Sequence, residues 1–178
     1  MVFHISCFSM VVCITIMWIV VRIAAWIRHR GVDWKYEAKL LTVYICIVVI
    51  ARFVYFPMQR VNGRIPDLIF RYPDNRPLRY NLIPFVHLAD VYGGWLLNII
   101  GNVLMFIPVG IFWPMCFKKL DTVGKVILVG CGFSLLIELT QLLFYIRYTD
   151  VDDLFLNTAG VAIGAVLYFA VLRRGKRK

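Results

Sequence analysis

The sequence has few charged residues and none of the short motifs that mark common classes of soluble enzyme. Only 17% of its 178 residues are charged, whereas 61% are hydrophobic, and a soluble domain of this size could not cover so much apolar surface. It lacks a P-loop, a zinc signature and a Ser or Cys nucleophile motif. Its five cysteines form no Cys-x-x-Cys pair, which argues against disulfides and thiolate metal sites.

Five long apolar runs replace these features, at residues 2–27, 40–56, 95–117, 126–146 and 154–172. A membrane-spanning helix needs about 20 mostly apolar residues. The alternating pattern of a membrane barrel strand is missing, so the backbone must satisfy its hydrogen bonds within helices. The sequence predicts an all-α integral membrane protein, a small bundle of five transmembrane helices without a soluble domain.

The distribution of basic residues predicts the orientation of these helices. With the N-terminus outside, twelve Lys and Arg fall in the inner segments and six in the outer ones, which favours an N-out, C-in topology. No basic residue precedes the first run, so we expect no cleaved signal peptide. Arg22 and Arg52 lie near the ends of their runs and are expected to reach a membrane interface. The basic tail indicates contact with anionic lipid, and nothing indicates a nucleic-acid partner.

The segment between the second and third runs, residues 57–94, is rich in proline and arginine and lies outside in this topology. It holds five of the seven prolines, five arginines and no lysine. Arginine suits phosphate and carboxylate recognition, so one interpretation is an anion-binding collar that includes Arg71, Arg76 and Arg79. The other interpretation is ordinary contact with lipid head groups.

Glu138 lies within the fourth run and is the most informative residue of the chain. A carboxylate in hydrocarbon is costly and by default marks a functional site. At helical spacing Ser134, Glu138, Gln141 and Tyr145 share one stripe. The neighbouring helices and loops offer further polar groups in the same outer half of the membrane. These are Asn98, Asn102, Arg147, Asp150, Asp152, Asp153 and Asn157.

These groups predict one polar pocket with several chemistries open to it. Glu138, Asp150 and Asp153 could act as a general acid or base. The same residues with Asp152 could hold a divalent cation through oxygen atoms. A structural alternative also stands, because Asn, Gln and Ser often only link membrane helices, and Asp152 or Asp153 could cap the fifth helix.

The order and spacing of several motifs resemble the VanZ-like family of bacterial membrane proteins. The motifs are Asn81-Leu-Ile-Pro84-Phe85, Asn102 followed by Pro108 and Gly110, Glu138-Leu-Thr-Gln141, and Arg147-Tyr-Thr-Asp150-Val-Asp152-Asp153 continuing through Asn157 and Gly160 to Gly164. The family core usually begins with one helix before the Asn-x-x-Pro-Phe element. We therefore expect an additional helix and basic cytoplasmic loop over 1–39, a VanZ-like domain over 40–172 and a basic cytoplasmic tail over 173–178.

The resemblance implies a multi-pass protein of the bacterial cytoplasmic membrane, linked to resistance against glycopeptides of the teicoplanin type. The leading hypothesis is a protein that binds a lipid-linked cell-wall precursor or a lipoglycopeptide at the outer leaflet, through Asn81, Asn102, Gln141, Arg147 and Asn157. The alternatives are a carboxylate- or metal-dependent hydrolase or transferase acting on such precursors, and a small transporter or flippase. The sequence shows no internal repeat that would favour transport, and it leaves the oligomeric state open.

Overall fold

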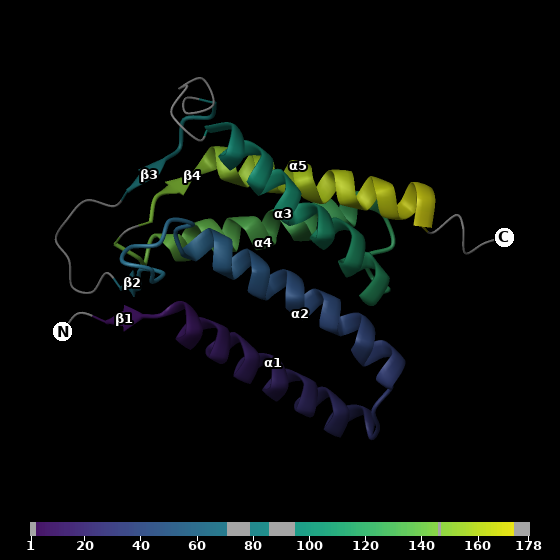
Figure 1. Cartoon of the computed structure of the whole chain (residues 1–178). Coiled ribbons are helices and arrows are strands. Elements are labelled where there is room, and N and C mark those ends of the chain that lie inside the picture. Colours follow the sequence, from purple (N-terminus) through teal and green to yellow (C-terminus); the bar gives the residue numbers. More distant parts are fainter. Residues whose placement is uncertain (1–2, 71–78, 86–94, 146, 173–178) are drawn as a thin grey trace. The chain divides into compact units, whose positions relative to one another are not determined.

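The computed structural model describes residues 3–70, 79–85, 95–145 and 147–172 (Figure 1). These residues form five long helices, a final π-helical turn and four two-residue strands. In chain order they are β1 (His4–Ile5), α1 (Cys7–His29), α2 (Trp34–Tyr55), β2 (Leu68–Ile69), β3 (Tyr80–Asn81), α3 (Trp95–Cys116), α4 (Val123–Gln141), β4 (Thr149–Asp150), α5 (Val151–Leu167) and η1 (Tyr168–Leu172). By length and composition all five helices, α5 being counted through Val171, are able to cross a membrane. This confirms the predicted helical class and the number of candidate spans.

The chain divides into two compact units, each with its own internal contacts. One unit comprises residues 1–74 with 144–146, and the other comprises 75–143 with 147–178. The first holds α1, α2, β1 and β2, and the second holds α3, α4, α5, β3 and β4. Each unit is described by itself below.

In the first unit α1 and α2 form a hairpin. The Ser6 hydroxyl caps the start of α1 by accepting from the Ser9 N–H. The Asp33 carboxylate caps α2 by accepting from the N–H groups of Lys35 and Tyr36. Because of this cap, α2 begins six residues before the apolar run predicted at 40–56. The hairpin is joined near its middle by Thr15 and Tyr44, whose hydroxyls lie 2.7 Å apart.

The first unit also contains a small apolar core beside the short strands. β1 pairs antiparallel with β2, and Phe144 forms an isolated bridge with Phe70. Phe56, Leu68 and Phe144 are buried together in this core. The Tyr145 N–H donates to the Ile69 carbonyl at 2.9 Å. Because residues 144 and 145 pair with the backbone of residues 69 and 70, they are not helical.

The helix α4 is therefore shorter than the apolar run that predicted it. The run extends to residue 146, whereas the helix ends at Gln141. Ser134, Glu138 and Gln141 do lie on one helix, but Tyr145 is not part of it. Glu138 lies three residues from the helix end, about 5 Å along the helix axis.

In the second unit α5 packs on both α3 and α4, and its approach to α3 depends on glycine. A Cβ atom built on Gly160 would lie 2.2 Å from the Val103 carbonyl oxygen. One built on Gly164 would lie 2.1 Å from the Ile107 carbonyl oxygen. Gly110 of α3 meets the α5 backbone in the same way. The Gly-x-x-x-Gly spacing of α5 thus allows backbone contact between the two helices, as such motifs do in membranes.

Candidate functional site

A cluster of buried polar side chains lies in the second unit, where α4 ends and α5 begins. We call this cluster the polar site. It comprises Asn81, Asn102, Ser134, Glu138, Thr149, Asp150, Asp152, Asp153 and Asn157. All but Asp150 and Asp153 are buried, with exposed fractions of 8% or less. Most residues of this cluster are those that the sequence predicted to meet in one pocket.

A short parallel ladder brings two distant segments of the chain to the polar site. Tyr80 pairs with Thr149, and Asn81 pairs with Asp150. The Thr149 N–H donates to the Arg79 carbonyl at 3.1 Å, and the Thr149 hydroxyl donates to the Glu138 carbonyl at 2.8 Å. Thr149 therefore joins the end of α4 to the ladder. Nothing in the helical pattern of the sequence had singled out this threonine.

Asp150 makes three hydrogen bonds in the polar site. Its Oδ1 atom accepts from the Asp152 N–H at 3.0 Å, which caps α5. The same oxygen accepts from the Asn81 side-chain amide at 3.0 Å, and the Asp150 N–H donates to Glu138 Oε2 at 3.1 Å. The expectation that Asp152 or Asp153 caps α5 was wrong, because the extended backbone at Asp150 places its carboxylate over the first turn.

The Asn81-Leu-Ile-Pro-Phe segment wraps around the start of α5. Asn81 Oδ1 accepts from the Ile83 N–H at 3.0 Å, which folds the segment into a turn. Phe85 then adopts a positive φ of 66°, which is unusual for a bulky residue. Its N–H donates to Asp152 Oδ1 at 2.7 Å, and its ring stacks on that of Phe155, with ring centroids 5.8 Å apart. The carboxylates of α5 thus hold this segment in place.

Asp152 is the most deeply buried carboxylate of the cluster, with an exposed fraction of 3%. Its Oδ1 atom accepts from Phe85, as described above. Its Oδ2 atom is buried and has no hydrogen-bond partner among the described residues. Buried polar atoms without partners are uncommon and need an explanation. This oxygen is therefore an acceptor that a ligand could use.

The remaining contacts join α5 to its two neighbouring helices. Asn102 of α3 donates to Asp153 Oδ1 at 2.5 Å. Asn157 Nδ2 donates to the Ser134 hydroxyl of α4 at 2.9 Å. Asn157 Oδ1 is buried without a partner among the described residues.

Other predicted site residues are close to this cluster or lie outside the described part of the chain. Gln141 is buried at the last position of α4. Arg147 lies near enough to Glu138 and Asp153 to act on both electrostatically. Arg79 contributes its backbone carbonyl to the ladder, and its side chain is exposed. Arg71 and Arg76 lie outside the described residues, so the collar stays a prediction.

The structure gives no geometric support for a metal centre in the residues it describes. Among them, no three His, Cys, Asp or Glu side chains come together in a way that could hold a metal ion. The four carboxylates Glu138, Asp150, Asp152 and Asp153 instead accept from amide and backbone N–H groups. At least one oxygen of each carboxylate is engaged in this way. The divalent cation considered from the sequence stays a prediction.

One ion pair was not predicted from the sequence. Arg22 was expected to reach a membrane interface, but its guanidinium pairs with Glu37 across the α1–α2 hairpin. Glu37 lies in the first turn of α2, and the α1–α2 hairpin brings it to Arg22. An arginine in one apolar run and a glutamate at the start of the next could have suggested this pair.

The five apolar helices define the class of the chain as a multi-pass helical membrane protein. Its polar site consists of buried carboxylates and amides at one end of a three-helix unit. The family model described as VanZ/LLP1 matches residues 41–173, and the chain belongs to this family. It is 35% identical over 88 residues to Protein VanZ of Enterococcus faecium, an alignment that covers 49% of this chain and 51% of that protein. The chain thus matches about half the length of this curated relative. No solved structure matches the chain.

Proposed function

We propose that this chain is a protein of the bacterial cytoplasmic membrane that binds a lipid-linked or lipidated molecule at the polar site. Binding there would lower the susceptibility of the cell to glycopeptides of the teicoplanin type. Membership of the VanZ/LLP1 family supports the link to resistance. The five apolar helices support a location within a membrane.

The observation that carries the proposal is the buried carboxylate of Asp152. Its Oδ2 atom lacks a donor among the described residues, as does the Asn157 Oδ1 atom of the same cluster. An unsatisfied buried acceptor costs about 1–3 kcal/mol, and a purely structural network would be expected to satisfy it. A ligand with hydroxyl, amide or ammonium donors would supply the missing hydrogen bond.

The position of the polar site suits an amphiphilic ligand. Glu138 lies about one turn from the end of α4, and Asp152 lies at the start of α5, so the site is at the ends of two candidate spans. A lipid tail would stay in the bilayer while a polar head reaches these carboxylates. The charge distribution of the loops supports an N-out, C-in orientation, which would place this end at the outer leaflet.

The proposal is tested by changing the carboxylates to amides. Glu138→Gln and Asp152→Asn keep the size and one acceptor of each side chain but remove the charge. We expect both variants to insert in the membrane at the parental level and to lose protection against teicoplanin. The measurements are the minimal inhibitory concentration in a susceptible host and the binding of a fluorescent lipoglycopeptide to the purified protein in nanodiscs.

A matched control is available in the loop between α3 and α4. Asp121→Asn makes the same carboxylate-to-amide change at an exposed position, where the carboxylate pairs with Lys125 at 2.7 Å. This variant should protect as the parent does. If Glu138→Gln and Asp152→Asn also protect fully at equal membrane level, the carboxylates have only a structural role. Turnover of a lipid-linked precursor in the same nanodiscs would instead support the hydrolase or transferase alternative.

A further inference from the structure

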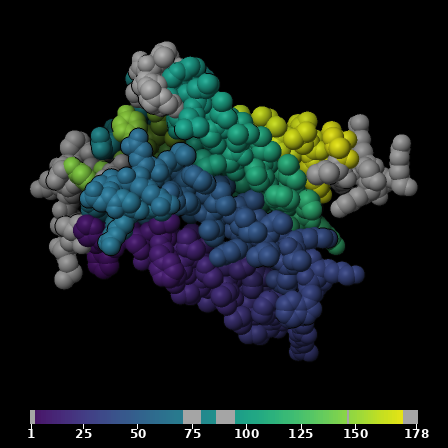
Figure 2. Space-filling view, in the orientation of Figure 1, coloured from purple at the N-terminus to yellow at the C-terminus, as the bar shows by residue number. Residues whose placement is uncertain are grey.

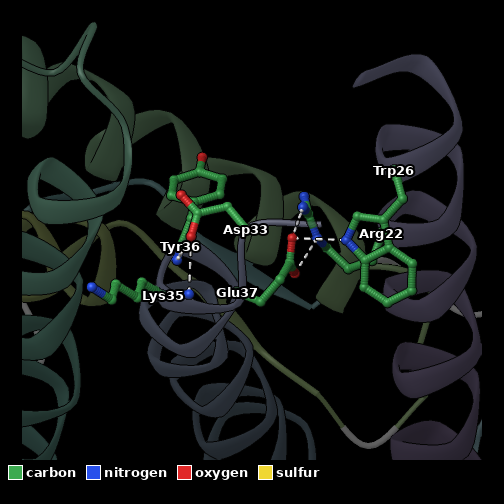
Figure 3. Close-up of polar contacts among 6 residues, drawn as sticks. All are labelled: Arg22, Trp26, Asp33, Lys35, Tyr36 and Glu37. Carbon is green, nitrogen blue, oxygen red and sulfur yellow. Dashed lines mark hydrogen bonds and ion pairs between the residues drawn. The ribbon is translucent and has the colours of Figure 1, made fainter. Parts of the chain in front are cut away.

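The α1–α2 hairpin contains a bidentate ion pair between two spanning segments. Arg22 Nε donates to Glu37 Oε2 at 2.9 Å, and Arg22 Nη2 donates to Glu37 Oε1. The Trp26 indole N–H donates to the same Oε1 atom at 2.8 Å. Figure 3 shows Arg22 and Trp26 directed from α1 at the Glu37 carboxylate of α2. The Glu37 carboxylate is thus fully engaged, while Arg22 Nη1 donates to no described residue.

A groove lies between the two helices beside this pair. Its volume is about 360 Å³, within the lower part of the range for ligand sites, ~300–1,000 Å³. Its walls are mainly apolar and include Trp18, Trp26, Trp34, Ala38 and Leu41. The rings of Trp26 and Trp34 lie 6.5 Å apart and are tilted by 53°. No residue of α1 is buried, and Figure 2 shows the surface of α1 (purple) open along its visible length.

The charge around this groove is positive. From residue 22 to residue 39 the sequence holds five Arg or Lys and two acidic residues. One of these acidic residues, Glu37, is already neutralised by Arg22. Arg28, Arg30 and Lys35 are exposed at the same end of the hairpin. Juxtamembrane basic clusters attract anionic lipid, and tryptophan is favoured at the depth of lipid head groups.

We infer that this groove is a binding site for one anionic phospholipid. The acyl chain would lie against the tryptophan rings and Leu41. The phosphate would accept from Arg22 Nη1, because a guanidinium that pairs with a carboxylate through one edge still presents donors on another edge. The pair with Glu37 fixes the orientation of these donors. The groove residues precede position 41 except Leu41 itself, so nearly the whole site lies outside the residues that match the family model.

The site is tested with the tryptophans that line it. The chain has five tryptophans, and a Trp95→Phe, Trp113→Phe background leaves fluorescence only from Trp18, Trp26 and Trp34. The full chain in this background is reconstituted in vesicles that contain either dibrominated phosphatidylglycerol or dibrominated phosphatidylcholine at equal fractions. Bromine quenches a tryptophan that it contacts. We expect the groove to prefer the anionic lipid about fivefold. This is the factor that corresponds to the attraction of one basic side chain to anionic lipid, about 1 kcal/mol.

Salt distinguishes a built site from diffuse attraction by the exposed basic residues. At about 1 M salt the Debye length falls to about 3 Å, so accumulation of lipid by long-range charge disappears. A phosphate in contact with Arg22 should keep most of its preference. Equal quenching by the two brominated lipids at high salt would overturn the proposal.

Two variants test the roles of the pair and of the groove. Arg22→Gln with Glu37→Gln removes the phosphate donor while the net charge stays constant, and it should abolish the high-salt preference. Ala38→Phe fills the groove while the ion pair stays in place, and it should lower the preference as well. The matched control is Ala24→Phe, which adds the same ring on α1 at an exposed position outside the groove. A preference that survives in both Arg22→Gln/Glu37→Gln and Ala38→Phe would show that the groove is not the site.

Discussion

The backbone N–H of Asp150 lies 3.1 Å from Glu138 Oε2. The residue whose side chain caps α5 therefore holds, through its backbone, the carboxylate of α4. One residue thus fixes the start of α5 and the buried carboxylate of Glu138 near the end of α4. Changes at this position are expected to affect both stability and the polar site.

The cap at Asp150 can be tested by removing its carboxylate. Asp150→Ala removes the acceptor of the Asp152 N–H and of the Asn81 amide. We expect a loss of about 1–2 kcal/mol in the free energy of unfolding, which is typical for a lost helix cap. Asp150→Asn keeps an oxygen in the same place and should lose much less. Thermal unfolding of the purified proteins in one detergent measures the difference, and equal losses for both variants would contradict the capping role.

The glycine contacts between α3 and α5 predict a large effect from one methyl group. Gly164→Ala would place a Cβ atom 2.1 Å from the backbone oxygen of Ile107, so the helices must separate. We expect a loss of about 1–3 kcal/mol, as for overpacked cores. Gly132→Ala is the matched control, because its Cβ would meet nothing within 4 Å, and helix propensity favours alanine there by up to ~1 kcal/mol. Thermal unfolding should move in opposite directions for the two variants.

The buried bond between Ser134 and Asn157 predicts a cost for removing a single hydroxyl. Ser134→Ala leaves the Asn157 amide without its partner in the interior. An unsatisfied buried donor typically costs about 1–3 kcal/mol. Thr158→Ala also removes a hydroxyl from this helix pair, but that hydroxyl bonds the Leu154 carbonyl of its own helix, so this control should be nearly neutral. Equal unfolding temperatures for Ser134→Ala and the parent would disprove a stabilising role for this bond.

The N-out, C-in orientation predicts which positions a membrane-impermeant thiol reagent can reach in intact cells. In a background without the five native cysteines, Arg64→Cys should react from outside. Gly31→Cys should react only after the membrane is permeabilised, and a Cβ at this position meets no other atom within 4 Å. Labelling of both positions from the same side would refute the proposed topology.

Much of the fold was predictable because bilayer physics leaves few choices. Long apolar runs must be helices in a membrane, and all five runs are helices here. Helix ends were less predictable, since they depend on caps and on pairing rather than on apolar character. Asp33 starts α2 early, and the pairing of Phe144 with Phe70 ends helical structure before residue 146.

The polar site was partly predictable for a related reason. Helical spacing placed Asn98 and Asn102 on one face of α3, and Asn102 contacts Asp153. The pairing of Asn81 with Asp150 joins residues 69 positions apart, and neither composition nor periodicity carries that information. The motif order resembling the VanZ-like family brought these residues into consideration, but it did not indicate that Phe85 would donate its N–H to Asp152.

The backbone contact between α3 and α5 has a mechanical consequence for the second unit. The backbones of α3 and α5 are in direct contact at their glycines, so neither helix can slide or tilt freely against the other. We therefore expect α3 and α5 to move together as one rigid body. Asn102 of α3 and Asp153 of α5 both belong to this rigid body. Any opening that admits a ligand to the polar site must therefore come from parts that are attached more lightly. These are the end of α4 and the segment 79–85, which hydrogen bonds rather than packed backbones hold in place.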